Sequence, residues 1–124
     1  MFAFKKKYFL IIENIKDIDL RNIKKRNKFA IIYRNSVKNK QSFALKSFRK
    51  KCKSKGIAFF VANNIKLAKD LKADGIYLSA HNLGFKSLNL KTKNFSIIGS
   101  AHNIREISNK KKQGCDYILF SRLF

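Results

Sequence analysis

The stretch Ser96-Ile97-Ile98-Gly99-Ser100-Ala101-His102-Asn103 is typical of a buried strand that ends in a polar turn. A helix-like segment follows it and leads to a second apolar run, Gln113-Gly114-Cys115-Asp116-Tyr117-Ile118-Leu119-Phe120, four residues before Phe124. The pattern is strand, helix, strand, and it predicts a further helix. We therefore expect an architecture that is incomplete in this sequence.

The rest of the chain repeats this alternation. Apolar runs bounded by polar segments predict strands at Tyr8–Ile12, Phe29–Tyr33, Ile57–Ala62, Gly75–Leu78, Phe95–Gly99 and Tyr117–Phe120. Parallel strands need long crossovers, and a helix in each crossover covers the sheet, so the order predicts an α/β fold with a parallel sheet. The strands are apolar at consecutive positions, as expected when both faces are buried.

The segments between the strands have helical spacing or helix-forming content. The apolar residues of these segments are Ile18, Leu20 and Ile23, then Phe43, Leu45 and Phe48, then Leu67, Ala68 and Leu71, and finally Ile104 and Ile107, the last two on one face of a helix. The fourth gap, Leu83 to Asn94, is the least regular and predicts only a short helical turn.

Two architectures fit this alternation. A doubly wound sheet could be complete in 124 residues, whereas an eight-stranded barrel usually needs roughly 200 or more. Length favours the open sheet. Against it, neither GxGxxG nor GxxxxGK occurs, so the usual nucleotide-binding signals are missing.

Composition indicates one soluble globular unit. Apolar residues make up 45% of the chain, enough to fill a core. The longest uncharged apolar run near the N-terminus, Tyr8 to Ile12, is too short for a membrane span or a signal-peptide core, so we expect a cytoplasmic location. Cys52 and Cys115 lack CxxC or histidine partners at ligand spacing, and we expect ordinary thiols.

The net charge of +22 would normally suggest phosphate-bearing partners such as nucleic acid. The basic residues are mostly lysines, however, spread over nearly the whole chain together with many Asn, Ile and Phe, which is typical of AT-rich codon usage. Three clusters, Lys24-Lys25-Arg26, Arg49-Lys50-Lys51 and Lys110-Lys111-Lys112, fall in predicted helices, where a solvated outer face is the common explanation. We favour compositional drift over selected nucleic-acid binding.

Motifs at four strand ends, in order, resemble those of the thiamine phosphate synthase and TenI family. They are Ile32-Tyr33-Arg34, then Phe59-Phe60-Val61-Ala62-Asn63-Asn64 with Leu67-Ala68, then Ala73-Asp74-Gly75-Ile76-Tyr77-Leu78, and then Ile97-Ile98-Gly99-Ser100-Ala101-His102. The closing segment from Gly114 to Phe124 is similar to the family's GADYI-x-GPxF. The resemblance extends from Tyr8 to Phe124 and rests on the order and spacing of the motifs.

The resemblance implies an incomplete (βα)8 TIM barrel of about six βα units, with residues 1–124 forming a single domain that lacks the last two strands. It implies a transferase of thiamine biosynthesis that joins a pyrimidine diphosphate to a thiazole phosphate and releases pyrophosphate. Strands seven and eight, whose loops frequently hold a substrate phosphate in barrels, would be absent. The chain as written would therefore lack a large part of the expected active site, and an inactive protein is one of the expected outcomes.

Site residues follow from the same comparison. Arg34 matches the family's strand-two arginine and would contact the diphosphate, and Asn63 matches its strand-three asparagine. Ser100 is nearest to the family's strand-five serine, which makes it a catalytic candidate, with a Gly-to-His spacing one residue shorter here. His81 and His102 both follow strands and are candidates for substrate binding and for proton transfer.

The departures from the family pattern concern its metal. The two magnesium-binding aspartates fall on Asn64 and Asn82. Beside the strand-two arginine, the family's glutamine two residues before it is Ile32 here, and its lysine two residues after it is Ser36. An amide oxygen can ligate Mg2+ but brings no charge, so about two units of negative charge are lost. The resemblance implies Mg2+, and these substitutions put it in doubt.

Simpler roles compete with several of these assignments. Arg34 could snorkel from the barrel rim. Asn103 could cap the helix that begins at Ile104, with Glu106 completing a capping box. Asp74 could position a turn before its strand, and Glu13 or Asp116 could do the same.

Three functions remain open: a synthase-like transferase, a TenI-like protein that binds or tautomerises a thiazole phosphate, and a basic nucleic-acid-binding module. The partners expected for the first two are small phosphorylated pyrimidines and thiazoles. Six strands of a barrel would leave two open edges, so we also expect either poor solubility or pairing with a second copy.

Overall fold

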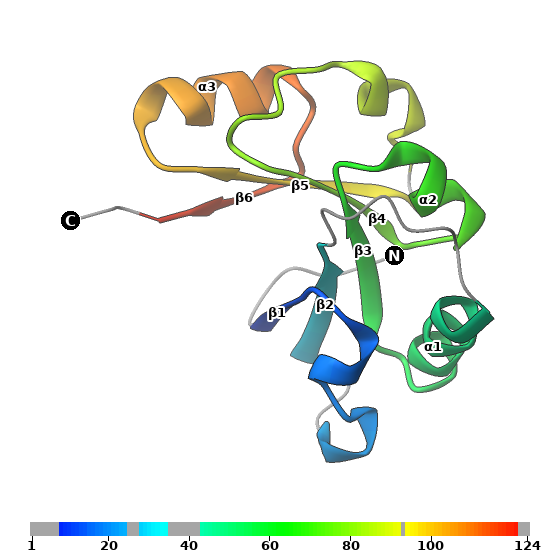
Figure 1. Ribbon diagram of the computed structural model, residues 1–124. Helices are drawn as coiled ribbons and strands as arrows, with labels where there is room; N and C mark the ends of the chain where they lie inside the picture. Colours follow the sequence, from blue (N-terminus) through cyan, green and yellow to red (C-terminus); the bar gives the residue numbers. More distant parts are fainter. Residues whose placement is uncertain (1–7, 25–27, 35–42, 93, 122–124) are drawn as a thin grey trace.

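The computed structural model describes residues 8–24, 28–34, 43–92 and 94–121. Six strands form one parallel sheet whose order in space is their order in the sequence (Figure 1). They are β1 (Tyr8–Ile12), β2 (Phe29–Tyr33), β3 (Ala58–Ala62), β4 (Gly75–Leu78), β5 (Ser96–Ala101) and β6 (Tyr117–Phe120). The predicted α/β alternation is confirmed. Strand β3 begins one residue later than predicted, and β5 begins one residue later and ends two residues later.

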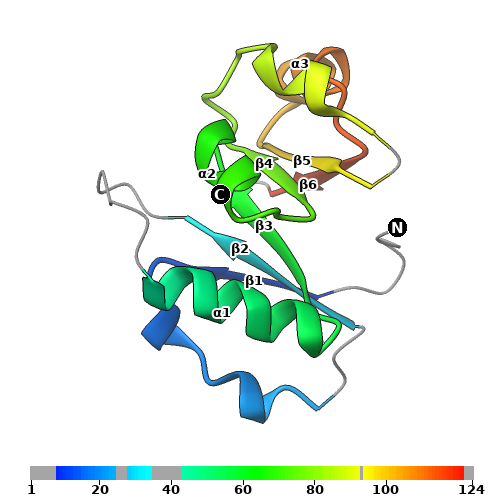
Figure 2. The ribbon, with the colours of Figure 1, turned by 90° about the vertical axis from the view of Figure 1, so that its right-hand side faces the viewer.

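The helices cover the convex face of the sheet (Figure 2). Helix α1 packs on β3, α2 on β3 and β4, and α3 on β5 and β6. Their bounds are α1 (Phe43–Ser54), α2 (Ile65–Asp70) and α3 (Ile104–Lys112), with short 3-10 turns η1 (Ile15–Asp17), η2 (Leu20–Asn22) and η4 (Lys86–Leu90). The described part of the chain contains no helix long and apolar enough to cross a membrane.

The sheet is curled into a half-barrel, because its first and last strands approach each other across the concave face. The rings of Phe9 in β1 and Tyr117 in β6 have centroids 5.7 Å apart. The concave face is lined by one apolar cluster, consisting of Ala30, Ile32, Phe60, Tyr77 and Ile98. This curvature brings the carboxyl ends of the strands around one rim.

The convex face carries the remaining core. Alternate residues of the strands, such as Ile31 and Phe59, pack there against Leu45 and Phe48 of α1. Both faces of the central strands are therefore buried, which explains their unbroken apolar runs.

Two aspartates tie the amino ends of the strands together. Asp74, just before β4, accepts a hydrogen bond from the backbone N–H of Phe59 at 2.8 Å. Asp116, just before β6, accepts one from the N–H of Ile97 at 2.9 Å. Each aspartate thus bonds to the strand before its own, and the positioning role predicted for both is confirmed.

The first crossover differs from the prediction. The expected helix is replaced by η1 and η2, because Asn14 and Asp19 accept hydrogen bonds from backbone N–H groups two residues ahead. Such local bonds favour short turns over a continuous helix. Leu20 and Ile23 are nevertheless buried in the core.

The expected solvated faces are wrong at two positions. Arg49 and Lys110 are buried, whereas their neighbours Lys50 and Lys111 are exposed. Of the third basic cluster, Lys24 is exposed and lies after η2 rather than in a helix, and residues 25 and 26 lie outside the described residues.

Two apolar residues of the predicted helices are exposed. Phe43, at the start of α1, is 88% exposed, and Ile104, at the start of α3, is 83% exposed. Both occupy the first turn of their helix, beyond the part that packs on the strands.

Candidate functional site

A cleft of about 700 Å³ opens at the carboxyl ends of β2, β3 and β4. The described residues that line it are Arg34, Ala62, Asn63, Asn64, Ile65, Ser79 and Lys86. They include two cations, two amides and a hydroxyl, and no carboxylate. Such a lining suits an anionic ligand.

Arg34 follows β2 and is half exposed. Its backbone N–H donates to the carbonyl of Ile12 at 2.8 Å, which extends the pairing of β1 and β2 by one residue. The guanidinium Nη2 lies 3.5 Å from Glu13 Oε1. This long ion pair places the guanidinium at the rim and leaves most of its donors available for a ligand.

Asn63 forms the corner of the cleft. Its φ of 60° lies in the left-handed region, which asparagine tolerates better than most residues. The side-chain Oδ1 accepts hydrogen bonds from the N–H of Ser79 at 3.1 Å and from Asn82 Nδ2 at 3.0 Å. Asn63 therefore joins the end of β3 to the loop after β4.

Asn64 and Asn82 do not fit a magnesium site. The Oδ1 of Asn64 caps α2 by accepting from the N–H of Leu67 at 3.0 Å, and that of Asn82 accepts from the N–H of Gly84 at 3.0 Å. No group of three His, Cys, Asp or Glu side chains suited to a metal occurs among the described residues. The amides serve the backbone, and the carboxylates that Mg2+ prefers are missing.

The loop that carries Asn82 is held from α3. Lys110 Nζ donates to the Asn82 carbonyl and to Gln113 Oε1, both at 2.7 Å. Gln113 Nε2 donates to the carbonyls of Asn82 at 2.7 Å and Gly84 at 2.8 Å. Burial lowers the pKa of Lys110, whose ammonium group has these two acceptors.

Ser100 and His102 lie at the end of β5, the strand next to β4, and neither lines the cleft. His102 Nδ1 is 3.4 Å from Glu106 Oε1, so this histidine has an oriented acidic neighbour. Glu106 also accepts from the N–H of His102 at 2.7 Å, and Asn103 caps α3 through the N–H of Glu106 at 2.9 Å. The predicted cap is confirmed, with the return bond made to His102 rather than Asn103.

His81 is exposed in the loop after β4 and does not line the cleft. The structure therefore brings Arg34, Asn63 and Asn64 together around the cleft, with Asn82 bonded to Asn63, and leaves the histidines outside it. Ser36 lies outside the described residues.

Sequence reasoning missed Lys86 and Ser79. Lys86 begins η4 in the least regular crossover and lines the cleft from the segment after β4, whereas Arg34 lines it from the segment after β2. The sequence contains many lysines, and nothing in it distinguishes Lys86 as a cleft residue. Ser79 could have been found, because it directly follows the predicted strand Gly75–Leu78.

Taken together, the fold and the cleft define an α/β protein of the parallel-barrel class with a polar, cationic cleft at its carboxyl rim. The family model described as thiamine monophosphate synthase matches residues 12–124. The chain belongs to the thiamine monophosphate synthase family.

Individual relatives agree with this assignment. The chain is 39% identical over 70 residues to a thiamine-phosphate synthase of Prochlorococcus marinus, covering 56% of this chain and 20% of the relative. It is 33% identical over 73 residues to a thiamine-phosphate synthase of Bacillus mycoides, covering 59% of this chain and 33% of the relative. The matches thus span a third or less of these relatives.

A solved structure supports the fold. Thiamine phosphate pyrophosphorylase from Pyrococcus furiosus superposes with a TM-score of 0.66 at 22% identity, covering 98% of this chain and 62% of that chain. The predicted barrel-type architecture is thereby confirmed.

Proposed function

We propose that the chain acts in thiamine biosynthesis as a synthase-like protein whose carboxyl-rim cleft binds the diphosphate of a hydroxymethylpyrimidine diphosphate. The observation that supports this most is the convergence of Arg34, Asn63 and Lys86 on one cleft without a lining carboxylate among the described residues. Membership of the family supplies the substrate class.

In this proposal the cleft residues stabilise negative charge on the departing pyrophosphate. The Arg34 fork can donate two parallel hydrogen bonds to phosphate oxygens, and Lys86 adds a second positive charge. Asn63 keeps the rim in shape, because its Oδ1 is used by Ser79 and Asn82 while its Nδ2 stays available as a donor. Catalytic roles for Ser100 and His102, and substrate binding by His81, stay predictions.

No step is assigned to Mg2+. Asn64 and Asn82 offer neutral oxygens that already accept backbone hydrogen bonds. We therefore propose that the described residues contribute no metal ligands, and that diphosphate binding depends on Arg34 and Lys86.

Calorimetric titration with the pyrimidine diphosphate tests this function. We expect Arg34→Gln to weaken binding about 10- to 100-fold, the range for a hydrogen bond to a charged group. Arg21→Gln is the matched control, because Arg21 is exposed and bonded to Asp19 away from the cleft. Absence of saturable binding by the unmodified chain, or equal effects of the two variants, would sink the proposal.

A TenI-like role is the second candidate, and the two asparagines favour it, because a thiazole phosphate can be bound without pyrophosphate displacement. Titration with thiazole phosphate alone distinguishes the two: binding of that ligand and not of the pyrimidine diphosphate would favour this role. Nucleic-acid binding, the third candidate, fails if arbitrary duplex DNA shows no affinity at physiological salt.

Pairing with a second copy also stays a prediction. Among the described strands, β1 pairs only with β2, and β6 only with β5. Tyr8 and Phe120 on these edge strands are 62% and 53% exposed. Size-exclusion chromatography showing a compact monomer would count against pairing. The cytoplasmic location is likewise a prediction, checked by fractionation.

A further inference from the structure

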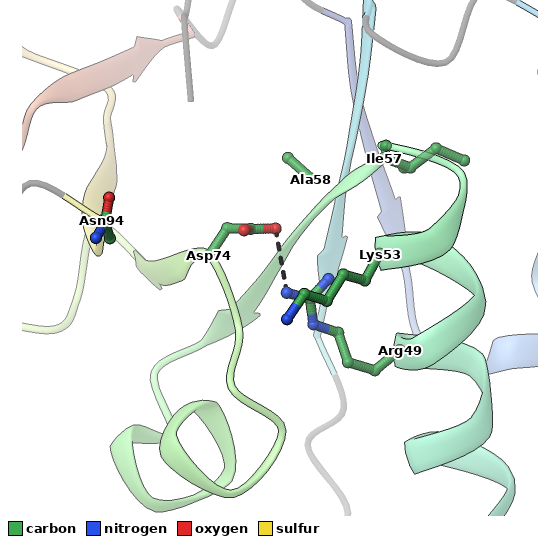
Figure 3. Close-up of a pocket in the computed structure, with 7 residues that line it drawn as sticks. Arg49, Lys53, Ile57, Ala58, Asp74 and Asn94 are labelled. Carbon is green, nitrogen blue, oxygen red and sulfur yellow. Dashed lines mark ion pairs between the residues drawn. The ribbon is translucent and has the colours of Figure 1, made fainter. Parts of the chain in front are cut away.

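A second hollow lies at the opposite end of the sheet from the cleft. It has a volume of about 330 Å³ and opens where α1 ends and β3 begins (Figure 3). The described residues that line it are Arg49, Lys53, Gly56, Ile57, Ala58, Asp74 and Asn94. Because Ala58 begins β3 and Asn63 follows its end, the two sites are separated by the length of the strand.

Arg49 is the unusual member of this lining. Its side chain is only 7% exposed, although it carries a permanent charge. The Nη2 donates to the carbonyl of Lys72 at 2.9 Å, and the Nε donates to that of Leu71 at 3.4 Å. The guanidinium also lies over the ring of Phe59, 5.8 Å from its centroid. These contacts fix the orientation of the guanidinium plane.

One side of the guanidinium is left without a partner. Arg49 Nη1 is buried and has no hydrogen-bond partner among the described residues. Buried donors are nearly always satisfied, and an unsatisfied one on a charged group is costly. An acceptor that is not part of the described chain would remove this cost.

The charge around Arg49 favours an anionic acceptor. Figure 3 shows the side chains of Lys53 and Arg49 extending from α1 toward Asp74. Asp74 Oδ2 is 3.5 Å from Arg49 Nη2, and the same oxygen already accepts the N–H of Phe59. One shared carboxylate faces two cations, so the lining keeps a net positive charge.

A neighbouring hollow adds to the excess of positive charge around Arg49. It has a volume of about 300 Å³ and shares Arg49 and Lys53 with the first. Its other charged lining residues are Lys46, Lys50, Lys72 and Asp70. Arg49 therefore lies between two basic hollows.

We propose that the first of these hollows, at the amino end of β3, is a binding site for a small phosphate-bearing anion. The anion is held by Nη1 of Arg49 and Nζ of Lys53. Its volume is near the lower end of ligand pockets, roughly 300 to 1,000 Å³, and suits orthophosphate or a small phosphomonoester. Nη1 is buried in this structure, so the proposal requires a side-chain movement that admits the anion. Lys53 is exposed and unbranched and can move at little cost.

The test is a titration of the full chain with inorganic phosphate, followed through backbone amide NMR shifts. We expect saturable shifts at Gly56 and Ala58 that are independent of those at Asn63 and Ser79 in the cleft. Arg34→Gln should leave the Gly56 and Ala58 response unchanged, which separates this site from the proposed function.

Two substitutions on α1 make the test specific. Lys53→Gln should weaken the phosphate affinity seen at Gly56 about 2- to 5-fold. Lys51→Gln should not weaken it. This control removes the same charge from an exposed position of the same helix outside the hollow. Arg49→Gln should weaken it at least about 10-fold. If Arg49→Gln does not fold, the Lys53 and Lys51 comparison decides. Phosphate shifts confined to the cleft, or equal effects at Lys53 and Lys51, would overturn the proposal.

Discussion

Lys110 Nζ on α3 donates a hydrogen bond of 2.7 Å to the backbone carbonyl of Asn82, across 28 positions of sequence. Asn82 in turn donates to Asn63 Oδ1 at the corner of the cleft. A fully buried lysine thus connects a helix on the convex face to the rim that carries the candidate site. The geometry of the rim depends on a residue that does not line the cleft.

Replacing this lysine should be costly for the fold. We expect Lys110→Ala to lower the free energy of unfolding by about 2 to 4 kcal/mol, because it leaves Gln113 Oε1 without its donor and opens space beside Gly99. Denaturant unfolding monitored by circular dichroism measures the change.

Lys111→Ala is the control for that experiment. Lys111 is exposed on the same helix, and its loss should change the unfolding free energy by less than about 0.5 kcal/mol. Similar losses for the two variants would show that the Lys110 contacts do not stabilise the protein.

The parallel sheet could be predicted from the sequence because its strands are buried on both faces. Runs such as Gly75–Leu78 then stand out as unbroken apolar segments, and four of the six strands have the predicted bounds. Arg34 and Asn63 were found through the family resemblance of the motifs at the ends of these strands. Residues that directly follow such strands must lie at the carboxyl rim.

What sequence could not predict depends on contacts distant in the chain. Arg49 and Lys110 sit in basic clusters whose neighbours are exposed. Acceptors distant in the chain, such as the carbonyls of Lys72 and Asn82, make their burial possible. Lys86 reaches the cleft through a crossover without periodic signal. Burial of a long cation is decided by which loop covers it, and local pattern carries no information about that.

Gly75, at the start of β4, should not tolerate a side chain. A Cβ there would collide with the carbonyl oxygen of Ser96 in β5 and approach Phe60 Cε1 to 2.7 Å. Because the first obstacle is backbone, the two strands must separate, and we expect Gly75→Ala to destabilise the protein by about 2 kcal/mol or more. Thermal unfolding measures this.

Gly84→Ala is the comparison for Gly75. A Cβ at Gly84 would meet only Asn82 Oδ1 at 3.4 Å, an ordinary contact, so the midpoint temperature should hardly change. A Gly75→Ala protein as stable as the Gly84→Ala protein would contradict the close approach of β4 and β5.

Cys52 should make stability fall at alkaline pH. Burial raises the pKa of its thiol from 9.0 to about 12, so the folded state holds the proton that the unfolded chain releases. The stabilisation is complete below pH 9 and is lost as pH rises toward 12. By pH 10 the loss should be about 1.4 kcal/mol.

The free energy of unfolding is measured against pH for the unmodified protein and for Cys52→Ala. Lysines and tyrosines titrate in both proteins, so the difference between the two slopes is the contribution of Cys52. Equal slopes would refute the raised pKa of Cys52.

Cys115, whose pKa burial raises to about 11, should resist alkylation at about pH 8 until the chain is unfolded.

Restoring carboxylates at the rim should create a dependence on Mg2+. Asn82 Nδ2 now donates to Asn63 Oδ1 at 3.0 Å. In the double variant Asn64→Asp, Asn82→Asp, a carboxylate oxygen at position 82 would face Asn63 Oδ1 instead. Two acceptors at that distance repel each other unless a cation lies between them. We expect diphosphate binding by this variant to be weaker than that of the unmodified chain without metal and to strengthen at least about 10-fold with Mg2+. Calorimetry of both proteins with and without Mg2+ measures the difference. Lys111→Glu, an equal change of charge at an exposed position that does not line the cleft, is the control. An unmodified chain that responds to Mg2+ as strongly as the double variant would show that the asparagines are not what limits metal binding.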